Sequence, residues 1–323
     1  MNERNERLKG FHKREETADH SFAVGYSGIK DILIPPDGKA EFIIYDNDQI
    51  FVKLDSSFAP KVLYPFSPVS FKPKAKAVLM DLDGTSADSE EFWVWIIQRT
   101  MQELMKDRGF QLSGEDIPYV SGYSVSEHLQ YCINKYAPYG DIAEARKLYY
   151  GITDYEMKEI LHGRGKTGAF KPRRYLKEFL TELKQNHIKI GLVTSGLYEK
   201  ALPEILSVFR QLDLGDPLEF YDAVITAGTT YRNGQSGTLG ELCAKPHPWL
   251  YSEISRVGLG ISEEDMEHVI VLEDSSAGVL AGALAGYSVV GMSDGNINKA
   301  GLDSLTCLLA DDLTQALKYI LGD

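Results

Sequence analysis

A short apolar segment that ends in two closely spaced carboxylates constrains this chain most. The run Ala77–Met80 is typical of a buried strand, and Asp81 and Asp83 follow it before Gly84 ends the strand. Side chains two residues apart on a strand point to the same side, so the two carboxylates can converge. Such a pair can hold a divalent cation and offer one oxygen as nucleophile and another as acid or base. An Asp-rich turn after a strand is common, so this pattern alone does not decide a function.

Three later segments carry further polar groups that could join this pair. The apolar run 190–193 ends in Thr194-Ser195-Gly196, and the run 269–272 ends in Glu273-Asp274. Between them stands Ala244-Lys245-Pro246-His247-Pro248. Each segment also has a plain structural reading, as a helix cap, a surface charge or an acidic helix start.

Taken in order, these groups resemble the four motifs of the haloacid dehalogenase superfamily. The order is acid pair, hydroxyl, lysine and acid pair, and the resemblance covers roughly residues 75–323. The stretch 83–90, Lys245-Pro246-His247-Pro248 and Glu273-Asp274-Ser275 resemble its phosphatase and β-phosphoglucomutase-like branch, which has a helical cap.

The pattern of the whole chain predicts an α/β fold with a doubly wound, Rossmann-like parallel sheet, an inserted α-helical cap and a small N-terminal β-rich extension. Helical patterns at 173–186, 247–257 and 276–285 lie between the strand signals, and this alternation is typical of parallel sheets. The strand signals stand at 77–80, 190–194, 222–226, 269–272 and 287–291.

We expect four parts along the chain. Residues 1–20 are highly charged and read as flexible, and 21–74 as a small β-meander followed by a proline-punctuated linker. Residues 75–90 and 169–323 form the catalytic core, and 91–168 form the helical cap. Within the core, the glycine-containing and polar segment 231–240 reads as a flexible loop near the site, either a substrate loop or a surface extension.

The resemblance implies phosphoryl transfer through an aspartyl phosphate. In that chemistry Asp81 is the nucleophile, and Asp83 protonates the leaving oxygen and then activates water. Thr194, Ser195, Gly196 and Lys245 bind the phosphoryl group, with Thr194 and Lys245 counted among the catalytic residues.

The resemblance also implies a Mg²⁺ site. Asp81 and Asp274 supply carboxylates and Asp83 supplies its backbone carbonyl, because Mg²⁺ prefers oxygen ligands and keeps several waters. Glu273 is either a further ligand or a group that orients one.

The composition limits the classes of molecule that this chain is expected to bind. The net charge is −13 and the pI about 5.1, which argues against broad binding to nucleic acid or anionic membranes. Three cysteines form no disulfide framework, and no apolar run reads as a leader or a membrane span. We therefore expect a cytoplasmic enzyme whose partner is a small phosphorylated metabolite.

The preferred function is a Mg²⁺-dependent phosphatase, and two alternatives stay open. A β-phosphoglucomutase-like phosphomutase is the first. The family's mutases carry a histidine early in the cap hinge and an arginine after a cap glycine, whereas this chain has Trp93 and Gly122-Tyr123-Ser124 there. A non-catalytic phospholigand-binding or regulatory protein that uses residues 21–70 for a partner is the second, although such a protein has no need of Asp83.

Overall fold

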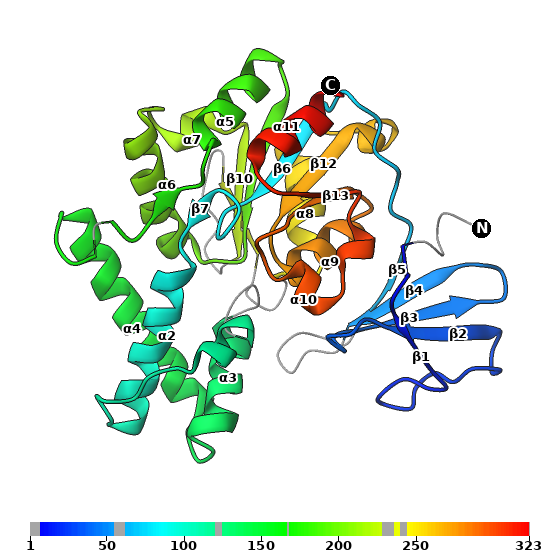
Figure 1. Cartoon of the computed structure of the whole chain (residues 1–323), viewed down its shortest axis with the longest axis horizontal. Helices are drawn as coiled ribbons and strands as arrows, with labels where there is room; N and C mark the ends of the chain where they lie inside the picture. The colour runs from blue at the N-terminus through cyan, green and yellow to red at the C-terminus, as the bar shows by residue number, and fades with distance from the viewer. Residues whose placement is uncertain are drawn as a thin grey trace.

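The computed structural model describes residues 7–54, 62–119, 125–166, 168–227 and 244–322, and the backbone of 236–239. A parallel sheet flanked by helices forms the centre, a group of helices extends from it, and a smaller antiparallel sheet precedes both in the chain (Figure 1). The predicted α/β fold with a helical insertion and an N-terminal β-rich extension is thereby confirmed.

The central sheet has the strand order β11-β10-β9-β6-β12-β13-β14, with every pair parallel. The strand that carries Asp81 lies in the middle, where both of its edges are paired and its five residues are buried. Continuous apolar strands are expected where both faces of a parallel sheet are covered. The strands are β6 (Ala77–Asp81), β9 (Lys189–Thr194), β10 (Ala223–Ala227), β11 (Ser236–Leu239), β12 (Val269–Glu273), β13 (Ser288–Met292) and β14 (Leu308–Ala310).

Helices cover both faces of this sheet. Val78 and Met80 face one apolar cluster, with α5, α6, α11 and the inserted helices, while Ala77 and Leu79 face a second cluster, with α8, α9 and α10. The core helices are α5 (Leu176–Gln185), α6 (Tyr198–Leu212), α7 (Pro217–Phe220), α8 (Trp249–Glu253), α9 (Ser276–Leu284), α10 (Ile297–Ala300) and α11 (Leu313–Leu321). Shorter turns are the π-helical Ile254–Gly258 and the 3₁₀ segments Glu263–His268 and Asp303–Leu305.

One part of the core differs from the sequence-based expectation. Residues Ser236–Leu239, inside the segment read as a loop, form strand β11 and pair in parallel with β10. This strand lies at the edge of the sheet, where an apolar pattern is less necessary because only one side is paired. Residues 231–235 and 240 lie outside the described residues.

The inserted segment is helical. It contains α2 (Glu90–Met105), the 3₁₀ segment Gly114–Tyr119, α3 (Val125–Tyr136) and α4 (Ile142–Leu161). Two short antiparallel strands, β7 (Ala87–Asp88) and β8 (Lys171–Pro172), connect this segment to the core on its way out and back. The segment therefore meets the core through a narrow ribbon close to the end of β6.

The N-terminal sheet has five antiparallel strands in chain order. Phe42, Val52 and Leu54 are buried in the same apolar cluster as α8 and α9, so the sheet packs directly on the core. Its first strand falls within the charged stretch 1–20 and its last within the expected linker, both at sheet edges, where proline is tolerated. The strands are β1 (His12–Arg14), β2 (Ile29–Ile34), β3 (Ala40–Tyr45), β4 (Ile50–Leu54) and β5 (Val62–Pro65).

No helix within the described residues combines the length and apolar character needed to cross a lipid bilayer.

The packing of Phe42 gives a test of how firmly this sheet belongs to the core. Its fully buried ring makes edge contacts with Phe11 and Phe66, at centroid distances of 5.1 and 5.3 Å. Phe42→Ala is expected to lower the free energy of unfolding by about 3–5 kcal/mol, because a buried aromatic leaves a cavity. Phe51→Ala, at a half-buried ring on β4, is the control and should cost clearly less in urea denaturation. Equal losses would contradict this packing role.

Candidate active site

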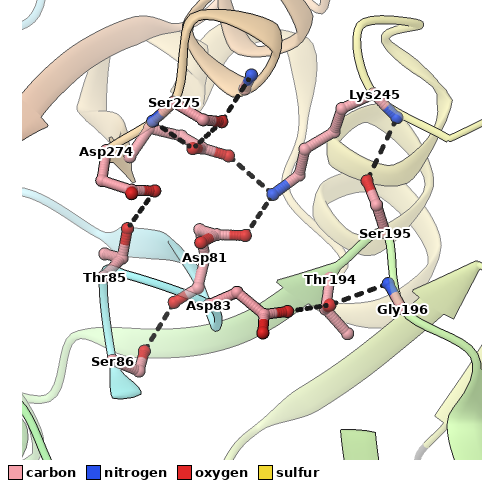
Figure 2. Close-up of polar contacts among 12 residues, drawn as sticks. Asp81, Asp83, Thr85, Ser86, Thr194, Ser195, Gly196, Lys245, Asp274 and Ser275 are labelled. Atoms are coloured by element: carbon pink, nitrogen blue, oxygen red, sulfur yellow. Dashed lines mark hydrogen bonds and ion pairs between the residues drawn. The ribbon is translucent and has the colours of Figure 1, made fainter. Parts of the chain in front are cut away.

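The polar groups predicted from the four motifs meet at the carboxyl ends of the central strands (Figure 2). Asp81 ends β6 and lies opposite Val193, the residue before Thr194 at the end of β9. On the other side β12 ends in Glu273, directly before Asp274. Ligands of doubly wound sheets bind at this edge.

A buried lysine joins two of the carboxylates. Lys245 Nζ donates to Asp81 Oδ1 and to Glu273 Oε1, the latter at 2.6 Å. The lysine side chain is 3% exposed and that of Glu273 is fully buried. The hydroxyl of Tyr251 also donates to Glu273 Oε1, and Ser275 Oγ donates to Oε2 at 3.1 Å. Both oxygens of Glu273 are thus occupied by this chain's own groups.

The cluster holds more negative charge than one lysine offsets. Burial, followed by the charge of Glu273, raises the pKa of Asp81 to about 8. Burial and the charge of Asp81 raise the pKa of Asp274 well above its usual range. Burial opposes the charge of Lys245, but the carboxylates of Asp81 and Glu273 raise its pKa. Ionising all the carboxylates therefore calls for a further positive charge.

The donor set fits a hard divalent cation. Asp81, Glu273 and Asp274 each have a carboxylate oxygen within 4.8 Å of the others. Carboxylate oxygens in an uncompensated negative cluster are the ligands that Mg²⁺ takes in proteins. The Asp83 side chain is not in this group of three.

The side chain of Asp83 instead lies on the far side of Asp81, beside Thr194. Its Oδ1 accepts a hydrogen bond of 2.7 Å from Ser89, and its Oδ2 lies 3.5 Å from Thr194 Oγ1. Lys200 Nζ, from α6, is 3.6 Å from the same Oδ2. The two aspartates of the first motif therefore have separate surroundings.

The turn after Asp81 depends on glycine. Gly84 has a φ of +82°, and a Cβ at this position would lie 2.2 Å from Asp274 Oδ2. Ser86 Oγ donates to the carbonyl of Asp81 at 2.5 Å and fixes the loop beneath the carboxylate. Only glycine lets the turn pass this close to the carboxylate of Asp274.

The loop after β9 is arranged by its own hydrogen bonds. The backbone N–H of Gly196 donates to Thr194 Oγ1 at 2.9 Å, and Ser195 Oγ accepts from the backbone N–H of Lys245 at 3.3 Å. The second and third motifs are thus joined directly.

A cavity brings most of the predicted residues together under the inserted helices. Asp81, Asp83, Ser195, Gly196, Lys245 and Asp274 all line it. Thr194 and Glu273 are buried behind its wall. The inserted helices close it with largely apolar side chains, together with one imidazole and one acidic residue. These residues are Glu90, Trp93, Ile97, Val125, His128 and Tyr149.

Sequence reasoning missed several residues around this cavity. Lys200, His128 and Tyr251 stand outside the motifs, and their positions depend on how separate helices pack. Glu204 on α6 is fully buried, and its carboxylate oxygens have no hydrogen-bond partner among the described residues. Burial, followed by the charge of Asp83, raises the pKa of Glu204. One signal was available: Lys200 is a cation in the first turn of a helix, where the helix dipole disfavours it.

His128 gives a pH-dependent test of the cavity. Burial, followed by the charges of Lys200 and Lys39, lowers its pKa from 6.5 to about 3. Between pH 6.5 and about pH 3, His128 therefore binds a proton in the unfolded state but not in the folded state. The contribution of this neutral imidazole to the free energy of unfolding is complete above pH 6.5. As the pH falls from there towards 3, that contribution is lost, by roughly 2–3 kcal/mol over two pH units.

In His128→Gln, urea denaturation should show a smaller difference in unfolding free energy between about pH 7 and pH 4.5 than in the wild type. Comparing the two pH values within each protein removes the packing change caused by the substitution. An unchanged pH dependence would contradict a neutral, buried His128.

Comparison with solved structures identifies proteins of similar fold. The structure of CbbY from Rhodobacter sphaeroides in complex with phosphate matches with a TM-score of 0.56 and 17% identity, covering 75% of this chain and 96% of that chain. A predicted phosphoglycolate phosphatase from Haemophilus somnus 129pt gives 0.56 and 17%, covering 76% and 98%. The β-phosphoglucomutase of Clostridium difficile gives 0.53 and 23%, covering 77% and 96%.

At these identities the structural likeness establishes a common fold and no more. The family is decided by the sequence itself. Residues 78–292, well over half of the chain, match the model of the haloacid dehalogenase-like hydrolases, and the four motifs of the cavity fall within this range. The chain therefore belongs to the haloacid dehalogenase-like hydrolase family.

Proposed function

We propose that this hydrolase is a Mg²⁺-dependent phosphatase that acts on a small phosphorylated metabolite through an aspartyl phosphate. The observation that carries the proposal is the division of labour between two neighbouring carboxylates. Asp81 is held by Lys245 in the buried cluster, while Asp83 lies apart, beside Thr194 and Ser89. One carboxylate can thus attack while the other handles the proton.

In the first half-reaction, an Asp81 oxygen forms a bond to phosphorus and the bond from phosphorus to the leaving oxygen breaks. The carboxylic acid of Asp83 gives its proton to that leaving oxygen, so the product departs as a neutral alcohol. Lys245, Thr194 and the backbone around Gly196 stabilise the charge on the transferring group.

In the second half-reaction, the Asp83 carboxylate takes a proton from water while the water oxygen attacks phosphorus. The bond between phosphorus and Asp81 breaks, which releases inorganic phosphate and restores both aspartates to their starting states. The inserted helices exclude other water from the cavity during the first step.

Asp81, Asp274 and the backbone carbonyl of Asp83 would hold the Mg²⁺. When bound, the ion would offset the electrostatic repulsion between the negatively charged carboxylate and the negatively charged phosphate. We assign Glu273 to holding Lys245, because Lys245, Tyr251 and Ser275 already use both of its oxygens.

The cavity supports a substrate with a compact and partly apolar body. Its cap side carries the apolar Trp93, Ile97, Val125 and Tyr149, together with the neutral His128 and with Glu90. CbbY, which has a similar fold, has been crystallised with phosphate, and a mutant of it with xylulose-(1,5)bisphosphate. These complexes support a sugar phosphate or a similar compound as the substrate here.

Simple hydrolysis is favoured over a mutase reaction by the cap hinge. The family's mutases have a histidine where this chain has Trp93, and an indole cannot exchange protons in its place. Gly122-Tyr123-Ser124, the second departure, lies outside the described residues. A non-catalytic binding protein would not need Asp83 or the contacts that Ser89, Thr194 and Lys200 make with it.

Phosphate release from a panel of phosphorylated metabolites is the direct test. We expect turnover that requires Mg²⁺ and falls below about 10⁻³ of the wild-type rate in Asp81→Asn, since the variant lacks the nucleophile. Asp154→Asn, an exposed aspartate on α4 paired with Lys158, is the matched control and should keep wild-type activity. No phosphate release from any compound by the wild type would refute the phosphatase assignment.

Glu273→Gln separates the two roles considered for this residue. If it orients Lys245, kcat/KM falls roughly 10–100-fold while the Mg²⁺ concentration that gives half-maximal activity stays nearly the same. A large rise in that Mg²⁺ concentration would show instead that Glu273 is a metal ligand. Melting curves with and without the metal establish that the variant is folded.

A further inference from the structure

Lys200 occupies a position that the stability of its helix does not explain. It lies in the first turn of α6 (Tyr198–Leu212), where the positive end of the helix dipole disfavours a cation. Its side chain is nevertheless only 15% exposed. Departures from local structural preference tend to gather at functional sites, so the contacts of this lysine call for explanation.

The side chain folds back over the loop that carries the second motif. A Cβ at Gly196 would lie 3.2 Å from Lys200 Cδ, closer than ordinary contact, so the absence of a side chain at Gly196 makes room for the lysine. The amine then lies 3.6 Å from Asp83 Oδ2 and 3.7 Å from the centroid of the Trp93 ring. Lys200, Asp83 and Trp93 all line the catalytic cavity.

These contacts connect the core to the inserted helices. Asp83 belongs to the core loop after β6, whereas Trp93 belongs to α2 of the inserted helices. A cation over the face of an indole ring is attracted by the ring's quadrupole, and the attraction is stronger in a desolvated site. The aromatic ring therefore favours the amine in the place where it also meets the carboxylate.

The lysine also completes the surroundings of Asp83. Ser89 fixes Oδ1 with a hydrogen bond of 2.7 Å, which leaves Oδ2 between Thr194 at 3.5 Å and Lys200 at 3.6 Å. Thr194 is also bound by the backbone N–H of Gly196. Among these contacts, Lys200 is the one whose polar group also meets an aromatic ring of the cap.

We propose that Lys200 is a positioning residue that couples closure of the cap to the orientation of Asp83. With the cap closed, the Trp93 ring holds the amine against Oδ2, and the carboxyl group is aimed at the leaving oxygen. When the cap moves away, the amine loses its aromatic partner and the hold on Asp83 weakens. Lys200 transfers no proton itself. The inference rests on the proposed phosphatase reaction, because it concerns the proton that Asp83 gives to the leaving group.

Two esters that differ in their need for that proton provide the test. An alkyl alcohol leaves only with a proton, whereas 4-nitrophenolate leaves without one. We expect Lys200→Met to lower kcat/KM roughly 10–100-fold for the best alkyl phosphate of the panel, part of what general acid catalysis contributes. For 4-nitrophenyl phosphate the change should stay within about threefold, because kcat/KM reports the steps through leaving-group departure. Lys200→Arg, which keeps the cation, should restore most of the loss.

The aromatic partner gives an independent arm. Trp93→Leu should show the same selective loss for the alkyl ester in smaller measure, while Trp93→Phe keeps a ring for the amine and should lie nearer the wild type. These variants test the coupling even if Lys200→Met does not fold. Lys177→Met, an exposed lysine on α5, is the matched control and should leave both rates unchanged.

Equal losses for both esters in Lys200→Met, or no loss for either, would overturn this inference and leave the phosphatase assignment intact. Failure of the wild type to hydrolyse either ester, with Mg²⁺ present, would count against the phosphatase reaction itself and, with it, the role given to Lys200. A selective loss without recovery in Lys200→Arg would contradict the role of the cation.

Discussion

The concentration of negative charge around Lys245 is the constraint on which the rest of this structure depends. Three carboxylates and one ammonium group lie together, and among them only Asp274 is partly exposed to solvent. Burying charge costs free energy unless each group is paired, and one lysine cannot offset three acids. The site therefore needs a rigid frame that holds the groups in contact, and the uncompensated negative charge suits it to a further cation such as the proposed Mg²⁺.

The central sheet supplies that frame. Adjacent parallel strands end at the same edge, so residues that are distant in sequence arrive within hydrogen-bond distance without long loops. Gly84 in the turn after β6 and Gly278 in the first turn of α9 leave room where the carboxylates lie. At Gly278, for example, a Cβ would lie 1.8 Å from the carboxyl carbon of Glu273. The glycines next to the site follow from the same crowding of charge.

This logic explains which features the sequence could predict. Asp81, Thr194 and Asp274 are predictable because each ends or follows an apolar strand, and the strands determine where they meet. Lys245 follows no apolar run, and only its motif with Pro246 and His247 pointed to it. Strand β11 and the edge strands of the N-terminal sheet were missed because unpaired edges demand no apolar pattern. Lys200 and His128 were missed for another reason. Their roles arise from the approach of inserted helices to the core, and no local pattern encodes that approach.

The N-terminal sheet joins the same network through the third motif. Tyr64 on β5 lies with its hydroxyl 2.9 Å from Nδ1 of His247, two residues after Lys245, and its ring contacts those of His247 and Trp249. His247 is buried, and burial lowers its pKa, so the neutral imidazole is favoured at this position. The extension thus packs on the segment that carries Lys245. A lysine shared by two buried carboxylates tolerates little displacement, since breaking either ion pair leaves a buried carboxylate uncompensated. The sheet that precedes the core is therefore part of what keeps that lysine in place.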